Sequence, residues 1–341
     1  MDRRTFLLTS LIAARQAMRS LPAEAEDMPP NSDSTGYPNA VLPTLGGKQF
    51  WNDELFFHDW HIQRNVFTGH YRLLSGANLR HAWGTFDECR AKLQQIQDKH
   101  RLPPMQGRAV IVLHGLFRTA TAMNKMCRHL REAGGYTIFN VNYASTRGTV
   151  ADHARSLARI TDNLEGVEEI NFVGHSLGNL VVRHYLGDQT DPNRGIAPDP
   201  RIRRMVMLGP PNRGARIAEA LGRVGAFHLV AGASATQLSR GWDALEERLA
   251  TPDFDFGILA GGRGTETGYN PLLGQDNDLV VSVASTRLAG AADFAVVPAM
   301  HTFMMDDATV QQYTLRFLQH GHFVSAAERQ TIDHVTLGDE A

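Results

Sequence analysis

The chain of 341 residues contains only two cysteines, Cys89 and Cys127. Two thiols cannot build a disulfide scaffold or a four-thiolate zinc site. If the protein is exported, a single disulfide between them is an open alternative. The 34 lysines and arginines do not exceed the 36 aspartates and glutamates, so no basic excess is available to neutralise the phosphates of a nucleic acid. No apolar run reaches the roughly 20 residues that a transmembrane helix needs, which excludes a multi-span membrane protein.

What the chain does contain is typical of a globular protein. Hydrophobic residues make up 43% of it and charged residues 21%. A chain of this length and composition buries a large core, so disorder of the whole chain is excluded. The length alone suggests about two domains, but single α/β domains can be longer than about 200 residues.

Residues 1–25 resemble an export signal. Arg3 and Arg4 precede the apolar run Phe6–Ala14, and Ala23–Ala25 has the small-x-small pattern of a cleavage site. We therefore expect this segment to be a twin-arginine-like signal peptide that directs the protein to the periplasm or out of the cell. The arginines at positions 15 and 19 favour the alternative, a cytoplasmic protein with a short N-terminal helix.

Residues 26–104 form an N-terminal extension. Residues 26–48 are rich in proline and small polar residues, which is typical of a linker or arm. His70–Trp83 reads as two short strands around a Ser-Gly turn. Thr85 lies three positions before Glu88, a capping box that predicts a helix from there to about position 100. The sequence assigns no role to this extension.

Residues 105–325 alternate between apolar strands and amphipathic helices, and a short tail of residues 326–341 follows. The expected strands are Ala109–Leu113, Tyr136–Tyr143, Ile170–Val173, Met205–Leu208, Phe256–Ala260 and Phe294–Val297. The expected helices between them are Met123–Ala133, Val150–Leu164 and Leu177–Leu186. This alternation predicts an α/β fold, in which a mostly parallel central sheet has helices on both faces.

One pentapeptide in this region carries chemistry. Gly174-His175-Ser176-Leu177-Gly178 matches G-x-S-x-G and lies between a predicted strand and a predicted helix, as a nucleophile elbow requires. Such a turn holds the Ser176 hydroxyl at the carboxyl end of the sheet, where the helix amino-terminus favours developing negative charge. The structural alternative is an ordinary serine N-cap. We expect Ser176 to be a nucleophile.

A serine hydroxyl needs a base to take its proton, and a carboxylate to orient that base. Asp278 lies downstream of Ser176 in the loop after one predicted strand, and His301 comes later still, after the last predicted strand. Because the chain has 15 histidines, His301 stands out by position rather than by type. Asp276 is a rival to Asp278, since either carboxylate could instead cap a loop.

A tetrahedral intermediate also needs two backbone N–H donors for its oxyanion. Leu177, directly after Ser176, is expected to supply one. The other is expected from the segment that follows His114-Gly115 at the end of the first buried strand, with Leu116 preferred and Phe117 as second choice. The structural alternative is a plain turn in which Gly115 has an unusual backbone angle.

With these motifs in place, residues 110–303 resemble the bacterial lipase and esterase branch of the α/β-hydrolase superfamily. The matching parts are Leu113–Leu116, Gly174–Gly178, Gly209–Gly214, Asn277-Asp278 and His301. The resemblance implies an α/β-hydrolase fold and a Ser-Asp-His triad that cleaves carboxylic esters. Pro210 and Ala215 stand where the family usually has Thr and Ser, and Leu279 stands where Gly is common. These departures leave the triad in place and bear on the substrate.

No cofactor or metal motif is present. The chain lacks H-E-x-x-H, a phosphate-binding loop with lysine and a spaced Cys/His set, so we expect neither cofactor nor metal. Some related lipases carry a structural calcium ion near the acid and the histidine. Asp306 and Asp307 follow His301 closely, but adjacent carboxylates at a helix start more often interact with the helix dipole.

Residues 215–250 are a candidate cap or lid. Ile217, Leu221 and Val224 share one helical face, and glycines interrupt the run at 222, 225 and 232. An apolar helix between glycine hinges could close over an acyl groove, which would favour longer acyl chains. The alternative is a fixed helix that packs on the sheet.

The sequence thus predicts a serine hydrolase that cleaves lipid-like or other acyl esters through an acyl-enzyme intermediate. The expected partners are a small-molecule or lipid ester and, transiently, a lipid surface, whereas nucleic acid is not expected. One alternative is an acyltransferase that uses the same triad. The other is a non-catalytic interaction protein with the same fold.

Overall fold

The computed structural model describes residues 42–43, 48–191, 193–214 and 232–333. These residues belong to one compact unit, Asn39–Ala341. The predicted signal peptide, the end of the C-terminal tail (residues 334–341) and the first half of the candidate lid lie outside the described residues. Among the described helices, none is long and apolar enough to cross a membrane.

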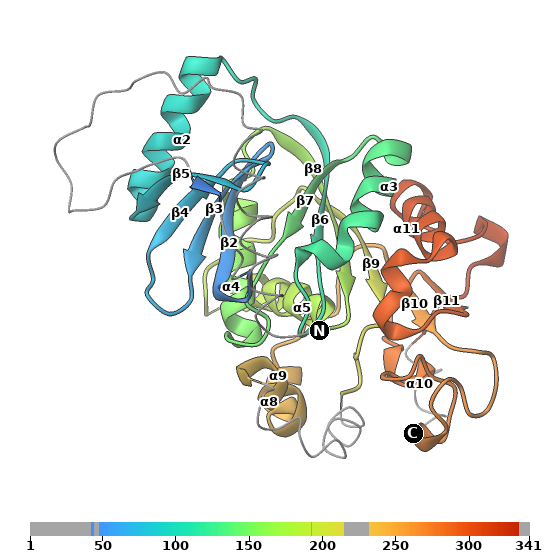
Figure 1. The fold of residues 1–341 in the computed structure, drawn as a ribbon. Helices are drawn as coiled ribbons and strands as arrows, with labels where there is room; N and C mark the ends of the chain where they lie inside the picture. The colour runs from blue at the N-terminus through green and yellow to red at the C-terminus, as the bar shows by residue number, and fades with distance from the viewer. Residues whose placement is uncertain (1–41, 44–47, 192, 215–231, 334–341) are drawn as a thin grey trace, which may run out of the picture. The chain divides into compact units, whose positions relative to one another are not determined.

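A sheet of six parallel strands forms the centre of this unit (Figure 1). Its strands are β6 (Gly107–Leu113), β7 (Thr137–Val141), β8 (Val167–His175), β9 (Ile202–Leu208), β10 (Phe256–Gly261) and β11 (Asp293–Val297). Their order is β11-β10-β9-β8-β6-β7. The chain therefore begins with β6, adds the edge strand β7 on one side of it, and then adds β8 to β11 in sequence on the other side. All six strands were predicted, and the predicted α/β fold with a parallel central sheet is confirmed.

Helices cover both faces of this sheet. On one face lie α4 (Val150–Asp162) and α5 (Leu177–Thr190), and on the other lie α3 (Asn124–Gly134) and α11 (Ala308–His320). Strand β6 shows why its sequence is continuously apolar. Alternate residues from Ala109 to Leu113 pack into the core under α4 and α5, while Val110 and Val112 pack into the core under α3 and α11.

The N-terminal extension forms a second, antiparallel sheet of five strands in the order β1-β5-β4-β3-β2. Its strands are β1 (Leu42–Pro43), β2 (Trp51–Phe57), β3 (Trp60–Asn65), β4 (Tyr71–Leu74) and β5 (Leu79–Gly84). The predicted hairpin is β4 and β5, whereas β2 and β3 were not predicted. Helix α2 (Phe86–His100) packs on this sheet and begins with the predicted capping box, in which Thr85 and Glu88 cap each other.

Shorter elements complete the described part of the chain. They are η1 (Lys48–Phe50), η2 (Ala120–Met123), α8 (Gly232–Arg240), α9 (Trp242–Glu246), η3 (Pro271–Leu273), α10 (Val283–Thr286), η4 (His301–Asp306) and η5 (Ala326–Glu328). Helices α8 and α9 occupy the second half of the candidate lid region. Cys89 and Cys127 are both buried and free, so the disulfide that the sequence left open is absent between them.

Candidate active site

Ser176 lies in a sharp turn between β8 and α5. Its backbone angles, φ 51° and ψ −117°, fall in a region that L-residues rarely adopt, at a cost of about 1–3 kcal/mol. The Ser176 amide donates to the carbonyl of Leu208 in the neighbouring strand β9, at 2.9 Å. This geometry is that of a nucleophile elbow, in which the turn presents the serine side chain at the carboxyl edge of the sheet.

The two glycines of the motif make this turn sterically feasible. A Cβ atom on Gly174 would lie 2.4 Å from the Asn179 side-chain oxygen. A Cβ atom on Gly178 would lie 2.7 Å from the backbone oxygen of Leu113. A larger residue at either position would not fit without a shift of its neighbours, so the elbow needs both glycines.

His301 and Asp278 form a direct pair. His301 Nδ1 lies 2.6 Å from Asp278 Oδ2, and the His301 amide donates to the Asp278 carbonyl at 2.9 Å. The carboxylate is fully buried, and its other oxygen accepts from the amides of Val280 at 3.0 Å and Val281 at 2.7 Å. Because an ionised carboxylate only accepts, it holds the proton of His301 on Nδ1 and leaves Nε2 as a proton acceptor.

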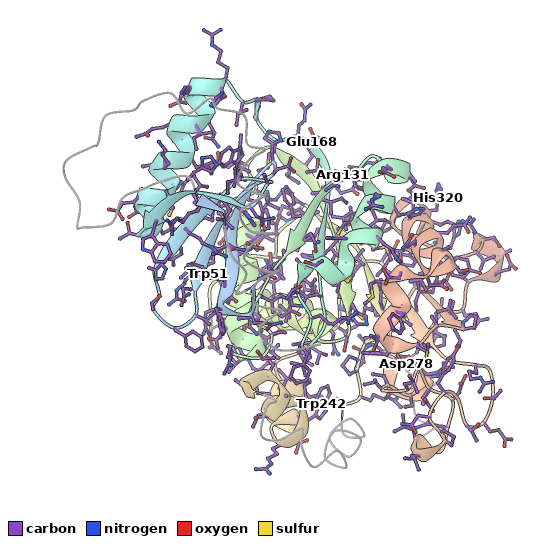
Figure 2. The ribbon with its side chains drawn as sticks, in the orientation of Figure 1. Trp51, Arg131, Glu168, Trp242, Asp278 and His320 are labelled. Atoms are coloured by element: carbon purple, nitrogen blue, oxygen red, sulfur yellow. The ribbon has the colours of Figure 1, made fainter. Side chains whose placement is uncertain are left out.

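The rival carboxylate, Asp276, has a different environment. Its oxygens accept from the backbone amides of Arg263 at 2.8 Å, Gly264 at 2.9 Å and Asn277 at 3.0 Å. It therefore caps the loop after β10, which is the alternative that the sequence left open for either aspartate. Figure 2 shows Asp278 among the C-terminal elements that follow this loop.

Ser176 and His301 approach the same place from different strands. His175, next to Ser176, has its Nε2 atom 2.9 Å from the His301 carbonyl oxygen, and the two rings are 4.8 Å apart. Leu208 accepts the hydrogen bond from the Ser176 amide, and the next residue, Gly209, lies beside the His301 ring. A Cβ atom on Gly209 would be only 3.1 Å from His301 Nδ1. Within the described residues, no hydrogen bond joins the Ser176 hydroxyl to His301. Catalytic hydrogen bonds of this kind often tighten only when substrate is bound.

His175 is a buried neighbour that the sequence analysis did not single out beyond its place in the motif. Burial, together with the adjacent His301, keeps the pKa of His175 well below its usual value. The ring is therefore neutral at neutral pH, and it adds no positive charge beside His301 when His301 takes up a proton.

The predicted oxyanion residues lie on two sides of Ser176. Leu177 is fully buried and is the first residue of α5, where the amide has no partner within the helix. Leu116 belongs to the tight turn Gly115–Arg118, which is closed by the Arg118 amide donating to the Gly115 carbonyl at 3.2 Å. A Cβ atom on Gly115 would lie 3.2 Å from Ser176 Cβ, so this turn runs directly beside the serine.

A stack of two aromatic rings, His114 and Tyr143, lies directly before this turn, and the sequence did not predict it. The ring of His114 lies parallel to that of Tyr143 at 4.1 Å, and the Tyr143 hydroxyl donates to the His114 carbonyl. Burial lowers the pKa of His114 to about 4, so its ring is neutral at neutral pH. The sequence signal for this pair was its position: His114 directly follows one predicted strand, and Tyr143 is the last residue of another.

The described residues contain no group of three or more His, Cys, Asp or Glu side chains that could hold a metal ion. Asp307 instead caps α11, where its side chain accepts from the amides of Thr309 at 2.8 Å and Val310 at 3.0 Å. Asp306 lies 3.7 Å from Lys125. Asp307 is thus part of a helix start, whereas Asp306 forms an ion pair with a residue of α3.

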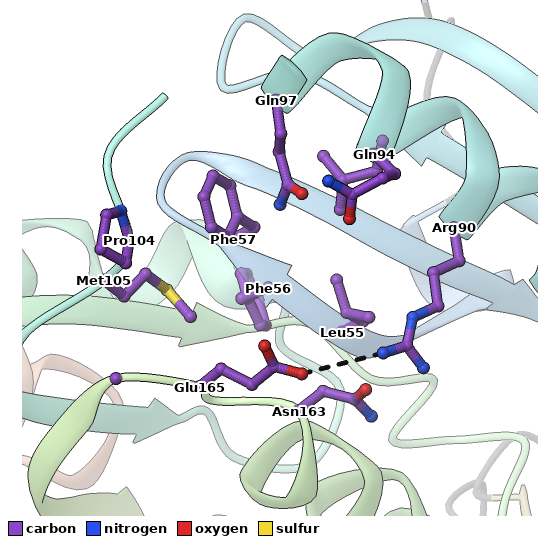
Figure 3. A pocket seen from close by; sticks show the side chains of 12 residues that line it. Leu55, Phe56, Phe57, Arg90, Gln94, Gln97, Pro104, Met105, Asn163 and Glu165 are labelled. Carbon is purple, nitrogen blue, oxygen red and sulfur yellow. Dashed lines mark ion pairs between the residues drawn. The ribbon is translucent and has the colours of Figure 1, made fainter. Parts of the chain in front are cut away.

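A cavity of about 360 Å³ lies away from these residues, between β2, α2 and the loop around Glu165 (Figure 3). Apolar side chains such as Leu55 and Met105 line its floor, and Arg90 lies 3.8 Å from Glu165 at its rim. None of its lining residues belongs to the predicted site. The cavity is therefore not where the predicted nucleophile acts.

No family model matches the chain, and no curated protein matches it. Among solved structures, the chain resembles the lin2722 gene product of Listeria innocua, with 16% identity and a TM-score of 0.44 over 67% of this chain and 98% of that one. It also resembles the phospholipase PlaB of Legionella pneumophila, with 19% identity and a TM-score of 0.45 over 68% and 60% of the two chains. A thermophilic esterase of Thermogutta terrifontis has 15% identity and a TM-score of 0.39, over 64% and 92%. At these values, the assignment of function depends on the site itself.

Proposed function

We propose that this protein is a serine hydrolase that cleaves carboxylic esters through an acyl-enzyme intermediate. The observation that carries the proposal is the buried His301–Asp278 pair, 2.6 Å apart, at the sheet edge where the elbow presents Ser176. A strained serine, a histidine with one nitrogen held by a buried carboxylate and a helix amino-terminus together form the machinery of acyl transfer.

In the proposed mechanism, each of these residues has one role. Ser176 Oγ attacks the ester carbonyl carbon while its proton passes to His301 Nε2. The carbonyl oxygen becomes an oxyanion, which the amides of Leu116 and Leu177 stabilise. The intermediate then collapses, the C–O bond to the alcohol breaks, and His301 gives its proton to the leaving oxygen. Water then attacks the acyl carbon while His301 takes its proton, the bond to Ser176 Oγ breaks, and His301 returns the proton to Oγ as the acid leaves.

Asp278 has an electrostatic role in this scheme. Its buried carboxylate faces the Nδ1–H of His301 and stabilises the imidazolium that forms when Nε2 takes the serine proton. The two backbone amides on its other oxygen keep it oriented. Loss of the charge would remove both effects at once.

Exposed apolar residues beside the site support a lipid-like or other acyl ester as substrate. Phe117 follows Leu116 and is 41% exposed, and Leu279 follows Asp278 and is 42% exposed. Met300 and Phe303 lie on either side of His301 and are 37% and 56% exposed. Apolar side chains of this size at the mouth of a polar site are suited to an acyl chain and to transient contact with a lipid surface.

An acyltransferase would use the same residues and differ only in the acceptor. Adding an alcohol during turnover separates the two, because a transferase would form the new ester in preference to the free acid. A non-catalytic interaction protein is disfavoured by the presence of the elbow strain, which costs stability and serves a nucleophile. Labelling of the purified protein by a fluorophosphonate probe separates this alternative from both enzymes.

The test of the proposed function is a panel of p-nitrophenyl esters of increasing acyl length, with Ser176→Ala as the control protein. We expect hydrolysis by the natural sequence, stoichiometric fluorophosphonate labelling, and neither in the variant. The absence of both hydrolysis and labelling in the folded natural protein would contradict the proposal.

Export through the segment 1–25, which lies outside the described part of the chain, also stays a proposal. Replacing Arg3 and Arg4 by lysine should retain the precursor in the cytoplasm, and mature protein should begin near Glu26. An intact Met1 on the native protein would contradict cleavage.

A further inference from the structure

The N-terminal extension contacts the turn that carries Leu116. Gln49, in the 3₁₀ turn η1 just before β2, donates from its side-chain amide to the carbonyl of Arg118, the last residue of that turn. The oxygen of the same amide accepts from the Thr146 hydroxyl at 3.4 Å. Gln49 is therefore held by the central domain on one side and holds the end of the turn on the other.

Arg118 extends this contact to the histidine. Its guanidinium donates to the carbonyl of Thr302 at 2.9 Å. Thr302 is the residue directly after His301. The backbone of Arg118 thus takes a hydrogen bond from the N-terminal extension, and its side chain gives one to the loop that carries His301. A single residue connects the two halves of the proposed site.

Strand β2 also supports the turn from the other direction. Asn142 binds the carbonyl of Trp51 through its side-chain amide at 2.9 Å, and Asp53 accepts from the Asn142 backbone amide at 2.6 Å. The backbone amide of Ala144 donates to the Asn52 side chain at 2.7 Å. These bonds hold the backbone on both sides of Tyr143, and the Tyr143 ring stacks on His114, the residue immediately before the turn. Trp51 is labelled on this sheet in Figure 2.

The backbone of this turn gives it a reason to need such support. Its closing hydrogen bond is long, at 3.2 Å, and Phe117 has a positive φ of 60°, which is unfavourable for a residue with a side chain. An oxyanion donor is effective only when it is held in place before the charge develops. A displacement of about 1 Å at a catalytic group can cost about 100-fold in rate.

We propose that residues 48–53 of the N-terminal extension are a clamp that positions the Leu116 amide for the oxyanion, with Gln49 as the positioning residue and Arg118 as its link to the His301 loop. The proposal rests on the proposed function, because it assigns the extension a part in the same site. It gives a role to a segment that lies outside the central sheet.

The test uses Gln49→Met in the full-length protein, since methionine keeps the length of the side chain and removes the donor. We expect kcat for a short p-nitrophenyl ester to fall by about 10- to 100-fold with KM nearly unchanged, because only the charged transition state uses the oxyanion donors. The affinity for an alkyl boronic acid, which forms a tetrahedral adduct on the serine, should fall by a similar factor. The thermal midpoint should stay within a few degrees.

The matched control is Gln94→Met on α2, whose side chain donates to Asp98 within the same helix, at 2.9 Å. Arg118→Gln tests the second link alone, because it removes the bond to Thr302 and leaves the backbone carbonyl that Gln49 binds. It should weaken boronic acid binding as well, and Arg118→Lys should restore part of the loss. In the double variant of Gln49 and Arg118, the losses should not add, because both hold one turn.

Three outcomes would overturn the clamp. Gln49→Met could match Gln94→Met in kcat, it could lose kcat without losing affinity for the boronic acid, or it could lose both only in proportion to lost folded protein. Each of these requires an active natural protein. Failure of the natural protein to hydrolyse esters or to label with fluorophosphonate would instead refute the proposed function, so the two failures are distinguishable.

Discussion

The two sides of the proposed site are built in different ways. On the nucleophile side, the elbow around Ser176 is determined by its own pentapeptide, because Gly174 and Gly178 have no room for a Cβ atom. On the oxyanion side, the turn Gly115–Arg118 is closed by a hydrogen bond of 3.2 Å and is also held by Gln49 from the N-terminal extension. The first side therefore depends mainly on the residue types of its own pentapeptide, and the second on a side chain that is distant along the chain.

This difference has a consequence for what each side can tolerate. The elbow should survive any change elsewhere that leaves β8 and α5 packed, because its constraint is steric and short-range. The oxyanion turn should respond to changes at positions far away in the sequence, such as Gln49. The predictions below test this contrast, beginning with the largest effect.

Replacement of the nucleophile should have the largest effect. Ser176→Ala should reduce ester hydrolysis by about four to six powers of ten while the fold is kept, because the elbow is fixed by backbone and by its glycines. The measurement is kcat/KM on a p-nitrophenyl ester, together with the thermal midpoint. Substantial activity in a preparation free of contaminating esterases would show that Ser176 is not the nucleophile.

The two aspartates should differ sharply. Asp278→Asn should lower kcat by about three to four powers of ten, because an amide cannot stabilise the imidazolium of His301. Asp276→Asn should lower it by less than about tenfold, because that carboxylate binds loop amides rather than the histidine. Steady-state kinetics of both variants decide the matter, and a greater loss in the Asp276 variant would reverse the assignment.

On the oxyanion side, His114 should make stability depend on pH. Its folded pKa of about 4 lies below the usual 6.5, so the unfolded chain binds a proton at a pH where the folded chain does not. The contribution of the neutral His114 ring to the free energy of unfolding is fully present above pH 6.5. It is lost as the pH falls toward 4, and the total loss is about 3 kcal/mol. Urea unfolding at pH 7 and pH 4.5 measures it. His114→Asn should show a shallower decline than the natural protein, and an equal decline would contradict the prediction.

The smallest effect is expected at the exposed rim, where the two sides can be compared directly. Phe117→Asp alters the oxyanion side and Phe303→Asp the histidine side. Each should cut activity on long-chain esters more than on acetate, by about 3- to 30-fold, because each buried CH₂ contributes about 0.8 kcal/mol. The variant with the greater selective loss identifies the side along which the acyl chain lies. Equal losses on both esters in both variants would remove the acyl-binding role of the rim.

The candidate lid offers a related comparison. The sequence predicts that Leu221→Asp and Phe227→Asp would also reduce activity on long-chain esters selectively, and both residues lie outside the described part of the chain. Within the described part of this region, α8 contacts the start of α4, where Gln237 accepts from the Val150 amide at 2.8 Å. The mobility of a lid stays a prediction.

Much of the architecture was readable from sequence because its causes are local. Continuous apolar runs predict strands that are buried on both faces, and most of the six central strands contain such a run. The capping box at Thr85 and the G-x-S-x-G motif likewise act over short stretches of chain. Strands β2 and β3 escaped prediction because polar residues interrupt their apolar pattern, and several of these are buried through partners that are distant in sequence, as Asp53 is through Gln63 and Asn142.

The sequence by itself determined the nucleophile elbow, the central sheet and the order in which serine, acid and histidine follow one another, since each depends on patterns that can be read along the chain. Only the tertiary structure distinguished the surroundings of Asp276 and Asp278, because two carboxylates so close in sequence look alike until one faces His301 and the other faces loop amides. It also decided what lies behind the oxyanion turn. Hydrogen bonds such as that from Gln49 to Arg118 join residues 69 positions apart, and no local pattern encodes a contact that exists only after two sheets have packed together.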